Sequence, residues 1–423
     1  MRKMYLSFSQ HPLELYNLIT QKCFTRSTMV LSDNDVVIVS AARTPIGSFL
    51  GSLSELKAHD LGSTAIKEVL KRANVLPNEI SEVILGQALT AGQGQNPARQ
   101  ASIKANIPNE VPASLVNMLC GSGLKSVGFA YQAIKSGDAT AIVAGGQECM
   151  SQAPHVINIR NGIKLNDAEM KDSMVFDGLT DAFHNIHMGI TAENIAKKWS
   201  ISRLEQDEYA YQSQVKTAKA QEGGYFDEEI VPVVISTRKG DVVVAKDEYP
   251  KANTTVEALQ KLRPVFQKDG TVTAGNASGI NDGAAAVLLM SYKTAQARNI
   301  QPLARIVAMS SAGVEPTLMG TGPIPAVNAV LAKAGWSKEE VDLFELNEAF
   351  AAQSIACLRE LGLDEAKVNV SGGAIALGHP IGASGTRVLV TLLYALKRLN
   401  KSKGVASLCV GGGMGIAIAI ERL

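Results

Sequence analysis

One loop–helix–strand stretch, which decides the fold, occurs twice in the chain. The first copy, residues 120–146, reads CGSGLKSVGFAYQAIKSGDATAIVAGG, and the second copy, residues 383–412, reads ASGTRVLVTLLYALKRLNKSKGVASLCVGG. In each copy a serine–glycine pair opens an apolar segment of helical spacing, and a strand-like apolar run ending in glycines follows. This repetition predicts a chain built from two similar halves.

The sequence before the first copy alternates between strand-like and helix-like segments. A β-branched run at 36–39 enters a predicted loop at 40–45, a helical pattern follows at 61–73, and a buried strand is predicted at 83–86. Such alternation is typical of parallel βαβ layers. The expected fold class is therefore α/β.

A more polar section interrupts this pattern between about residues 152 and 273. It predicts an inserted, loop-rich subdomain with a helix at 202–222. We therefore expect an N-terminal half at 35–300, which includes the insertion, and a C-terminal half at 301–423.

Residues 1–34 differ in composition from the rest and are predicted to be disordered or to act in targeting. The segment is amphipathic and poor in acidic residues, as a mitochondrial transit peptide would be. Alternatively, Met29 is the start that is used, which is the interpretation we prefer. We accordingly expect a cytoplasmic protein, with a mitochondrial one as the alternative.

Composition excludes several classes of protein. Apolar residues make up 46 % of the chain, and 41 basic residues face 40 acidic ones, so a nucleic-acid partner is not expected. No apolar stretch is long enough to span a membrane. The odd number of cysteines and the absence of a CxxC pair argue against a disulfide framework and against structural zinc.

The first candidate for chemistry is Cys120, in the sequence NMLCGSGLK at 117–125. A thiol at the start of a helix faces unpaired backbone N–H groups and the positive end of the helix dipole, so we expect its pKa to be lowered. A buried cysteine that fills a tight turn would fit the same loop equally well.

The second candidate is His379, in the glycine-rich segment GGAIALGHPIGASG at 372–385. Its position between Gly378 and Pro380 restricts the backbone, as an aimed imidazole requires. A phosphate-binding loop is the rival explanation. However, no Gly-Lys-Ser/Thr sequence follows, so this is not a Walker loop.

Two further motifs carry polar or nucleophilic groups. Cys409 ends a buried strand in LCVGGGMG (408–415), where the glycines expose backbone N–H groups beside the thiol, as an oxyanion site requires. Asn347 opens NEAF (347–350) after a strand-like run, and an ordinary helix N-cap is its alternative role.

Together these four motifs resemble the thiolase family, and the resemblance runs from about residue 36 to the C-terminus. It implies a layered α-β-α-β-α core made of duplicated βαβ halves. It also implies that Cys120 is the acylated nucleophile, that His379 activates it, and that Cys409 is the acid/base. Asn347 would hold a water beside His379 in one oxyanion hole, and the N–H groups of Cys120 and Gly411 would form the second.

The resemblance also suggests residues that bind coenzyme A. Ser278 matches the family's pantetheine-contacting serine. Met188 and His187 match the short-chain members, in which Met188 would close the acyl pocket and His187 would line the pantetheine tunnel. Lys251 stands where relatives often carry arginine near the adenine, so a planar stacking surface is lost.

The expected activity is the reversible condensation of two acetyl-CoA molecules to acetoacetyl-CoA and coenzyme A. Coenzyme A would be substrate and product, with no tightly bound cofactor, no nucleic-acid or membrane partner, and a homotetramer built as a dimer of dimers. A broader 3-ketoacyl-CoA thiolase of β-oxidation and a non-catalytic lipid-binding relative are the alternatives. A decarboxylating ketoacyl synthase would be expected to carry a second histidine where Cys409 stands.

Overall fold

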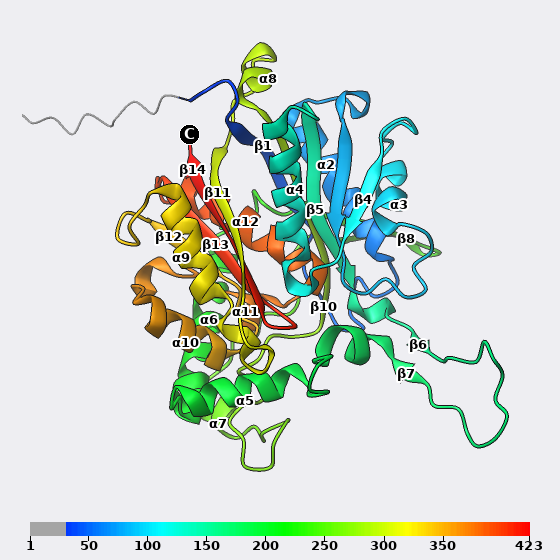
Figure 1. The fold of residues 1–423 in the computed structure, drawn as a ribbon, viewed down its shortest axis with the longest axis vertical. Coiled ribbons are helices and arrows are strands. Elements are labelled where there is room, and N and C mark those ends of the chain that lie inside the picture. The colour runs from blue at the N-terminus through cyan, green and yellow to red at the C-terminus, as the bar shows by residue number, and fades with distance from the viewer. Residues whose placement is uncertain (1–30) are drawn as a thin grey trace, which may run out of the picture.

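A computed structural model describes residues 31–423, so the predictions for residues 1–30 fall outside it. Its core is one large mixed sheet with two halves (Figure 1). The first half contains, in spatial order, β4 (Ala113–Val116), β3 (Glu82–Gly86), β5 (Ala141–Cys149), β10 (Asn281–Ser291) and β1 (Val36–Arg43). The second half continues with β11 (Ala304–Gly313), β14 (Met414–Arg422), β13 (Lys403–Val410) and β12 (Leu343–Leu346). The halves join where β1 pairs with β11 through only two residue pairs.

The strand pairing repeats from one half to the other. In the first half β3 runs parallel to β5, β5 antiparallel to β10, and β10 antiparallel to β1. The second half has the same pattern in β12, β13, β14 and β11. The predicted duplication is therefore confirmed. The expected parallel βαβ units are present, and each is followed by a strand that runs antiparallel beside it.

Two helices, α4 (Ser122–Ser136) and α12 (Ile381–Arg398), form the middle layer between the halves of the sheet. α12 contacts strands of both halves, and α4 packs on the first half and also reaches β14. Small residues allow the helices to approach closely: a Cβ on Gly385 would lie 2.4 Å from the backbone of Leu124, and a Cβ on Gly123 would lie 2.9 Å from the backbone of Gly382. The glycines shared by the two sequence copies are thus explained by helix packing.

The outer faces of the sheet are covered by the remaining helices (Figure 1). α2 (Ala58–Ala73) packs on β1, β5 and β10, with α3 (Pro97–Lys104) beside it. On the opposite side α9 (Pro323–Ala334) packs on β11 and β14, with α10 (Ala351–Leu361) beside it. The layers therefore follow the expected α-β-α-β-α order.

Strand β1 is longer than the sequence predicts. Ser40 to Arg43, expected in a loop, pair with residues 285–288 of β10. The buried Arg43 side chain is tolerated because its guanidinium lies 2.6 Å from Glu229 and 2.7 Å from Asp247. A charge compensated by residues distant in sequence is not visible in a local pattern.

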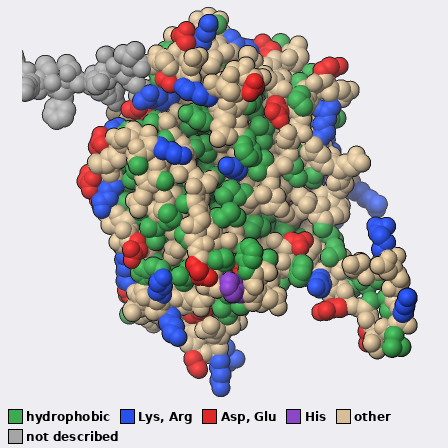
Figure 2. Space-filling view, viewed as in Figure 1, with side chains coloured by type: hydrophobic (Ala, Val, Ile, Leu, Met, Phe, Trp, Pro, Cys, Tyr) green, Lys and Arg blue, Asp and Glu red, His purple; other side chains and the backbone are tan. Residues whose placement is uncertain are grey.

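The insertion contains a projecting arm and several helices. The arm spans residues 155–172 and begins and ends in the short strands β6 (His155–Val156) and β7 (Lys171–Asp172); Figures 1 and 2 show it standing away from the body. The rest contains α5 (Met188–Lys198), α6 (Arg203–Glu222), β8 (Val233–Thr237), β9 (Gly240–Val244) and α7 (Val256–Gln260). The helix expected at 202–222 is confirmed, with Ser202 as its N-cap.

The remaining short elements are β2 (Gly47–Ser48), α8 (Tyr292–Ala297) and α11 (Ala374–Leu377). The predicted boundary at 300/301 lies between α8 and β11, and the domain limits as a whole stay predictions. Across residues 31–423, every helix is too short or too polar to cross a bilayer.

Candidate active site

Cys120 lies in a tight turn (Leu119–Gly121) between β4 and α4. Leu119 has a φ of 47°, which is rare for a residue other than glycine and marks a constrained backbone. The hydroxyl of Ser122 holds this turn: it donates to the Leu119 carbonyl at 2.6 Å and accepts the Met118 N–H at 2.8 Å. The turn presents the half-buried Cys120 thiol to a cavity.

The pKa of Cys120 differs from the sequence-based expectation. Burial raises it to about 11, although the backbone N–H groups of Gly411 and of Cys120 itself act in the opposite direction. The predicted lowering is therefore wrong in the ligand-free protein, because desolvation outweighs the dipoles at the start of the helix. Activation of the thiol then requires a nearby base.

His379, the sequence-based candidate for this base, is held rigidly. Its backbone N–H donates to Asn281 at 2.9 Å, and Gly378 before it has a φ of 104°, where a side chain would collide with Asn281. The imidazole Nδ1 lies 2.6 Å from the hydroxyl of Ser384, while Nε2 is buried without a partner among the described residues. Burial, and then the charge of Arg387, lowers the pKa of His379 to about 3, so the ring is neutral at physiological pH.

Exchanging His379 for asparagine should reduce the loss of folding stability that occurs as the pH becomes acidic. The unfolded histidine titrates near 6.5 and the folded one near 3. Between these values only the unfolded chain binds the proton, so wild-type stability falls as pH decreases through this window. Thermal melts of both proteins at about pH 7.5 and about pH 5 test this: the Tm of His379→Asn, relative to the Tm of wild type, should be higher at the lower pH. Parallel shifts in both proteins would contradict a buried, neutral His379.

Cys409 and Gly411 lie at the turn between β13 and β14. Gly412 and Gly413 make this turn with φ of 79° and 82°, a backbone conformation that would be strained in a residue other than glycine. Cys409 is buried in an apolar cluster with Met188 and Phe350. Burial, followed by the nearby charge of Cys120, raises the pKa of Cys409 well above its usual range.

Asn347 follows β12 and lies behind His379. Its amide Nδ2 is 3.5 Å from His379 Nδ1, and its Oδ1 is buried without a partner among the described residues. The alternative role as a helix N-cap is excluded, because α10 begins at Ala351 and Phe350 occupies its N-cap position.

A cavity of about 300 Å³ brings the predicted residues together from both halves of the chain. Seven of the nine sequence-based candidates line it: Cys120, His187, Met188, Ser278, His379, Cys409 and Gly411. Asn347 does not line it and reaches it only through its contact with His379. The first half thus supplies Cys120, and the second supplies His379, Cys409 and Gly411.

An aromatic wall of this cavity was missed by the sequence reasoning. His187 caps α5 by accepting the Gly189 N–H at 3.0 Å, and its ring stacks on Phe266 at 4.7 Å between centroids. Phe266 in turn meets the edge of Phe350. Burial lowers the pKa of His187, so it contributes a neutral ring. Phe266 lies in a charged loop without periodicity, which is why no local pattern singles it out.

Lys251 lies outside the cavity. Its ammonium group is 5.7 Å from the centroid of the Tyr249 ring, and that ring packs against Gly279, which does line the cavity. Lys251 is therefore near the site only through Tyr249, and its contact with coenzyme A stays a prediction.

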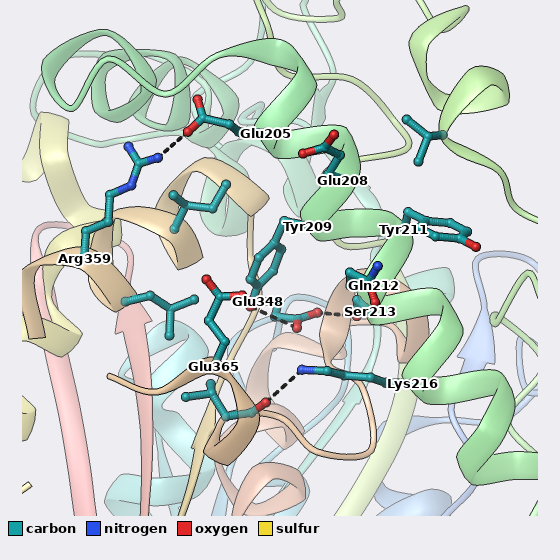
Figure 3. A pocket seen from close by; sticks show the side chains of 14 residues that line it. Glu205, Glu208, Tyr209, Tyr211, Gln212, Ser213, Lys216, Glu348, Arg359 and Glu365 are labelled. Carbon is teal, nitrogen blue, oxygen red and sulfur yellow. Dashed lines mark hydrogen bonds and ion pairs between the residues drawn. The ribbon is translucent and has the colours of Figure 1, made fainter. Parts of the chain in front are cut away.

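A larger hollow of about 520 Å³ lies between α6 and α10 (Figure 3). It reaches Glu348, the neighbour of Asn347, whose carboxylate accepts hydrogen bonds from Ser213 at 2.7 Å and Tyr209 at 3.2 Å. Its lining residues include neither a cysteine nor a histidine, so it lacks the thiol and imidazole that the smaller cavity brings together. In residues 31–423 we find no cluster of three or more side chains suited to a metal ion, and the four cysteines there are free thiols.

These features define a class of protein, since a thiol, an imidazole and a second thiol converge where two copies of one βαβ unit meet. A family model described as "Thiolase, N-terminal domain" matches residues 36–293, and one described as "Thiolase, C-terminal domain" matches residues 300–422. The chain belongs to the thiolase family.

Individual relatives are similar along almost the whole chain. The cytosolic acetyl-CoA acetyltransferase of Mus musculus is 59% identical over 93% of this chain and 100% of its own length. The acetyl-CoA acetyltransferase of Rhizobium meliloti is 58% identical, with the same coverage. A crystal structure of the Bacillus anthracis acetyl-CoA acetyltransferase superposes with a TM-score of 0.90, at 47% identity over 92% of this chain and 99% of that chain.

Proposed function

We propose that the protein is an acetyl-CoA C-acetyltransferase, which condenses two acetyl-CoA molecules reversibly to acetoacetyl-CoA and coenzyme A. The observation that carries this proposal is the convergence of Cys120, His379 and Cys409 on one cavity. The names of relatives at 58–59% identity support it. Coenzyme A is then a substrate and product, and the proposal includes no tightly bound cofactor.

In the first half-reaction Cys120 becomes acetylated. His379 Nε2 takes the thiol proton, and the sulfur keeps the electron pair and attacks the thioester carbonyl of the first acetyl-CoA. The N–H groups of Cys120 and Gly411, which favour the thiolate of Cys120, would also stabilise the tetrahedral oxyanion. Collapse of this intermediate releases coenzyme A as a thiolate, which takes up a proton, with Cys409 as the nearby acid.

In the second half-reaction Cys409 is the base. Its thiolate removes a methyl proton from a second acetyl-CoA, and the resulting carbanion attacks the acetyl carbonyl on Cys120. The bond between that carbonyl and the Cys120 sulfur then breaks, acetoacetyl-CoA is released, and the Cys120 thiolate takes its proton back from His379. The negative charge that develops on the thioester oxygen faces His379, with a water held through Asn347. The buried, unpartnered Oδ1 of Asn347 supports such a water.

Substrate-length profiling tests the short-chain assignment. Met188 and Met319 pack with Cys409 in one apolar cluster, and all three line the cavity, where the methionines would close the acyl pocket. We expect kcat/KM for acetoacetyl-CoA to exceed that for a sixteen-carbon 3-ketoacyl-CoA by about 100-fold or more, because forcing extra methylenes into a packed site is costly. Met188→Ala should raise kcat/KM for six-carbon 3-ketoacyl-CoA substrates relative to kcat/KM for acetoacetyl-CoA. Comparable rates on both substrates would instead favour a β-oxidation thiolase.

We also propose a homotetramer, arranged as a dimer of dimers, in the cytoplasm. The projecting arm supports the assembly: Ile159, Ile163, Leu165 and Met170 are exposed on it, Leu165 by 83%. Apolar side chains gathered on one extended segment fit contact with another copy of the chain. The cytoplasmic compartment is proposed because the mouse relative is a cytosolic acetyl-CoA acetyltransferase. The mass of the purified protein, measured by light scattering, tests the assembly.

A further inference from the structure

His379 has two ring nitrogens in different surroundings. Nε2 belongs to a residue that lines the cavity and has no partner among the described residues. Nδ1 points in the other direction, 2.6 Å from the hydroxyl of Ser384 in the first turn of α12. Since the buried ring is neutral, it carries one proton, and only an unprotonated Nε2 can accept a proton from Cys120.

The hydroxyl hydrogen of Ser384 has an acceptor other than the imidazole. Ser384 Oγ donates to the carbonyl of Pro380, one helical turn earlier, at 2.9 Å. With its hydrogen directed there, the oxygen turns its lone pairs towards Nδ1. A short contact between an N–H group and these lone pairs is a well-formed hydrogen bond, whereas two lone pairs at this distance would repel.

We propose that Ser384 is a positioning residue that keeps the proton of His379 on Nδ1. The inference rests on the proposed function, in which His379 activates Cys120. The S–H bond of Cys120 breaks, an Nε2–H bond forms, and the electron pair remains on sulfur. The imidazolium that results must donate through Nδ1, and Ser384 accepts that bond before and after the transfer, so no hydrogen bond has to be rearranged.

Asn347 is the competing partner of Nδ1. Its Nδ2 is a donor, which would favour an unprotonated Nδ1 and leave the hydrogen on Nε2. The separation of 3.5 Å, however, is at the limit of a hydrogen bond, whereas 2.6 Å to Ser384 is short. The contact with Ser384 therefore determines the tautomer.

The duplicated unit supports this role independently. Ser122 occupies the position in the first copy that Ser384 occupies in the second. Its hydroxyl also donates to a backbone carbonyl, that of Leu119, and also accepts a hydrogen bond, from the Met118 N–H. In each half, the serine in the first turn of the central helix thus holds the segment carrying the reactive side chain.

The first test compares two alanine variants that each lose one buried hydroxyl. For Ser384→Ala we expect kcat of the condensation to fall about 10- to 100-fold with KM nearly unchanged, a smaller loss than the about 10⁴-fold found where a carboxylate sets a catalytic histidine tautomer. Ser126→Ala is the control, because its hydroxyl is equally buried but bonds only to the carbonyls of Gly123 and Gly145. It should keep kcat within about 2-fold of wild type. An unchanged kcat in folded Ser384→Ala, or an equal loss in both variants, would overturn the proposal.

The second test observes the tautomer directly and needs no activity. In wild-type protein labelled with ¹⁵N-histidine, the His379 signals, assigned by their absence in His379→Asn, should show a protonated Nδ1 and an unprotonated Nε2. Ser384→Ala should shift them towards a mixture of both tautomers. A protonated Nε2 in wild type would refute the role of Ser384 even if that variant does not fold. Failure of the proposed function itself would appear separately, as wild-type protein that does not become acetylated.

Discussion

Exchanging Cys120 for alanine should abolish acetyl transfer, with a loss of about 10⁴-fold or more in kcat/KM. The other thiol that lines the cavity is not expected to replace it, because Cys409 is buried in an apolar cluster and burial raises its pKa well above the usual range. Intact-mass measurement after incubation with acetyl-CoA should show an acetyl adduct on wild type and none on Cys120→Ala.

Cys149→Ala is the matched control for this experiment. Cys149 is also buried, and its pKa is raised to a range where the thiol stays protonated, but it does not line the cavity. The control should become acetylated as wild type does. Full activity in Cys120→Ala, or a stable adduct on another residue of that variant, would disprove the assignment of the nucleophile.

Exchanging Cys409 for alanine should separate the two half-reactions. Cys120 keeps His379 and the N–H of Gly411, so acetylation is expected to continue. Removing the base should reduce the condensation by about 10²–10⁴-fold, the usual contribution of general acid–base catalysis. Exchange of the acetyl-CoA methyl protons with deuterated solvent should be lost to a similar extent.

Two measurements on the same sample decide this second prediction. Mass spectrometry reports the acetyl group on Cys120, and NMR of acetyl-CoA reports the deuterium in its methyl group. Undiminished deuterium uptake in Cys409→Ala would assign the base to another residue. Loss of both signals would mean that Cys409 also takes part in acetylation, as the proposed acid for the leaving thiolate.

Much of this site can be predicted from sequence because its residues lie in short motifs. Cys120, His379 and Cys409 each lie within two residues of a glycine that serves a turn or a close approach, and the repeated serine–glycine pair marks the central helices. Such motifs reflect the conformations that the backbone of each loop must adopt, so these loops can be identified from the sequence.

Other features could not be predicted because they depend on distant contacts. Phe266 lines the cavity in contact with His187 and Phe350, which are distant from it in sequence. The direction of the pKa shift of Cys120 follows from burial by both halves, which no local motif reports. Ser384 is present in the quoted motif, but only the folded first turn of α12 shows that its hydroxyl meets Nδ1 rather than solvent.

The division of the site between the two copies has a consequence for how the protein can evolve. One copy contributes the nucleophile and the other contributes the proton-transfer groups, so neither half retains a complete catalytic set by itself. The copies must therefore be inherited in one reading frame and produced in equal amounts. A single polypeptide guarantees that stoichiometry, and it leaves each copy free to specialise while the helices between them keep the same packing.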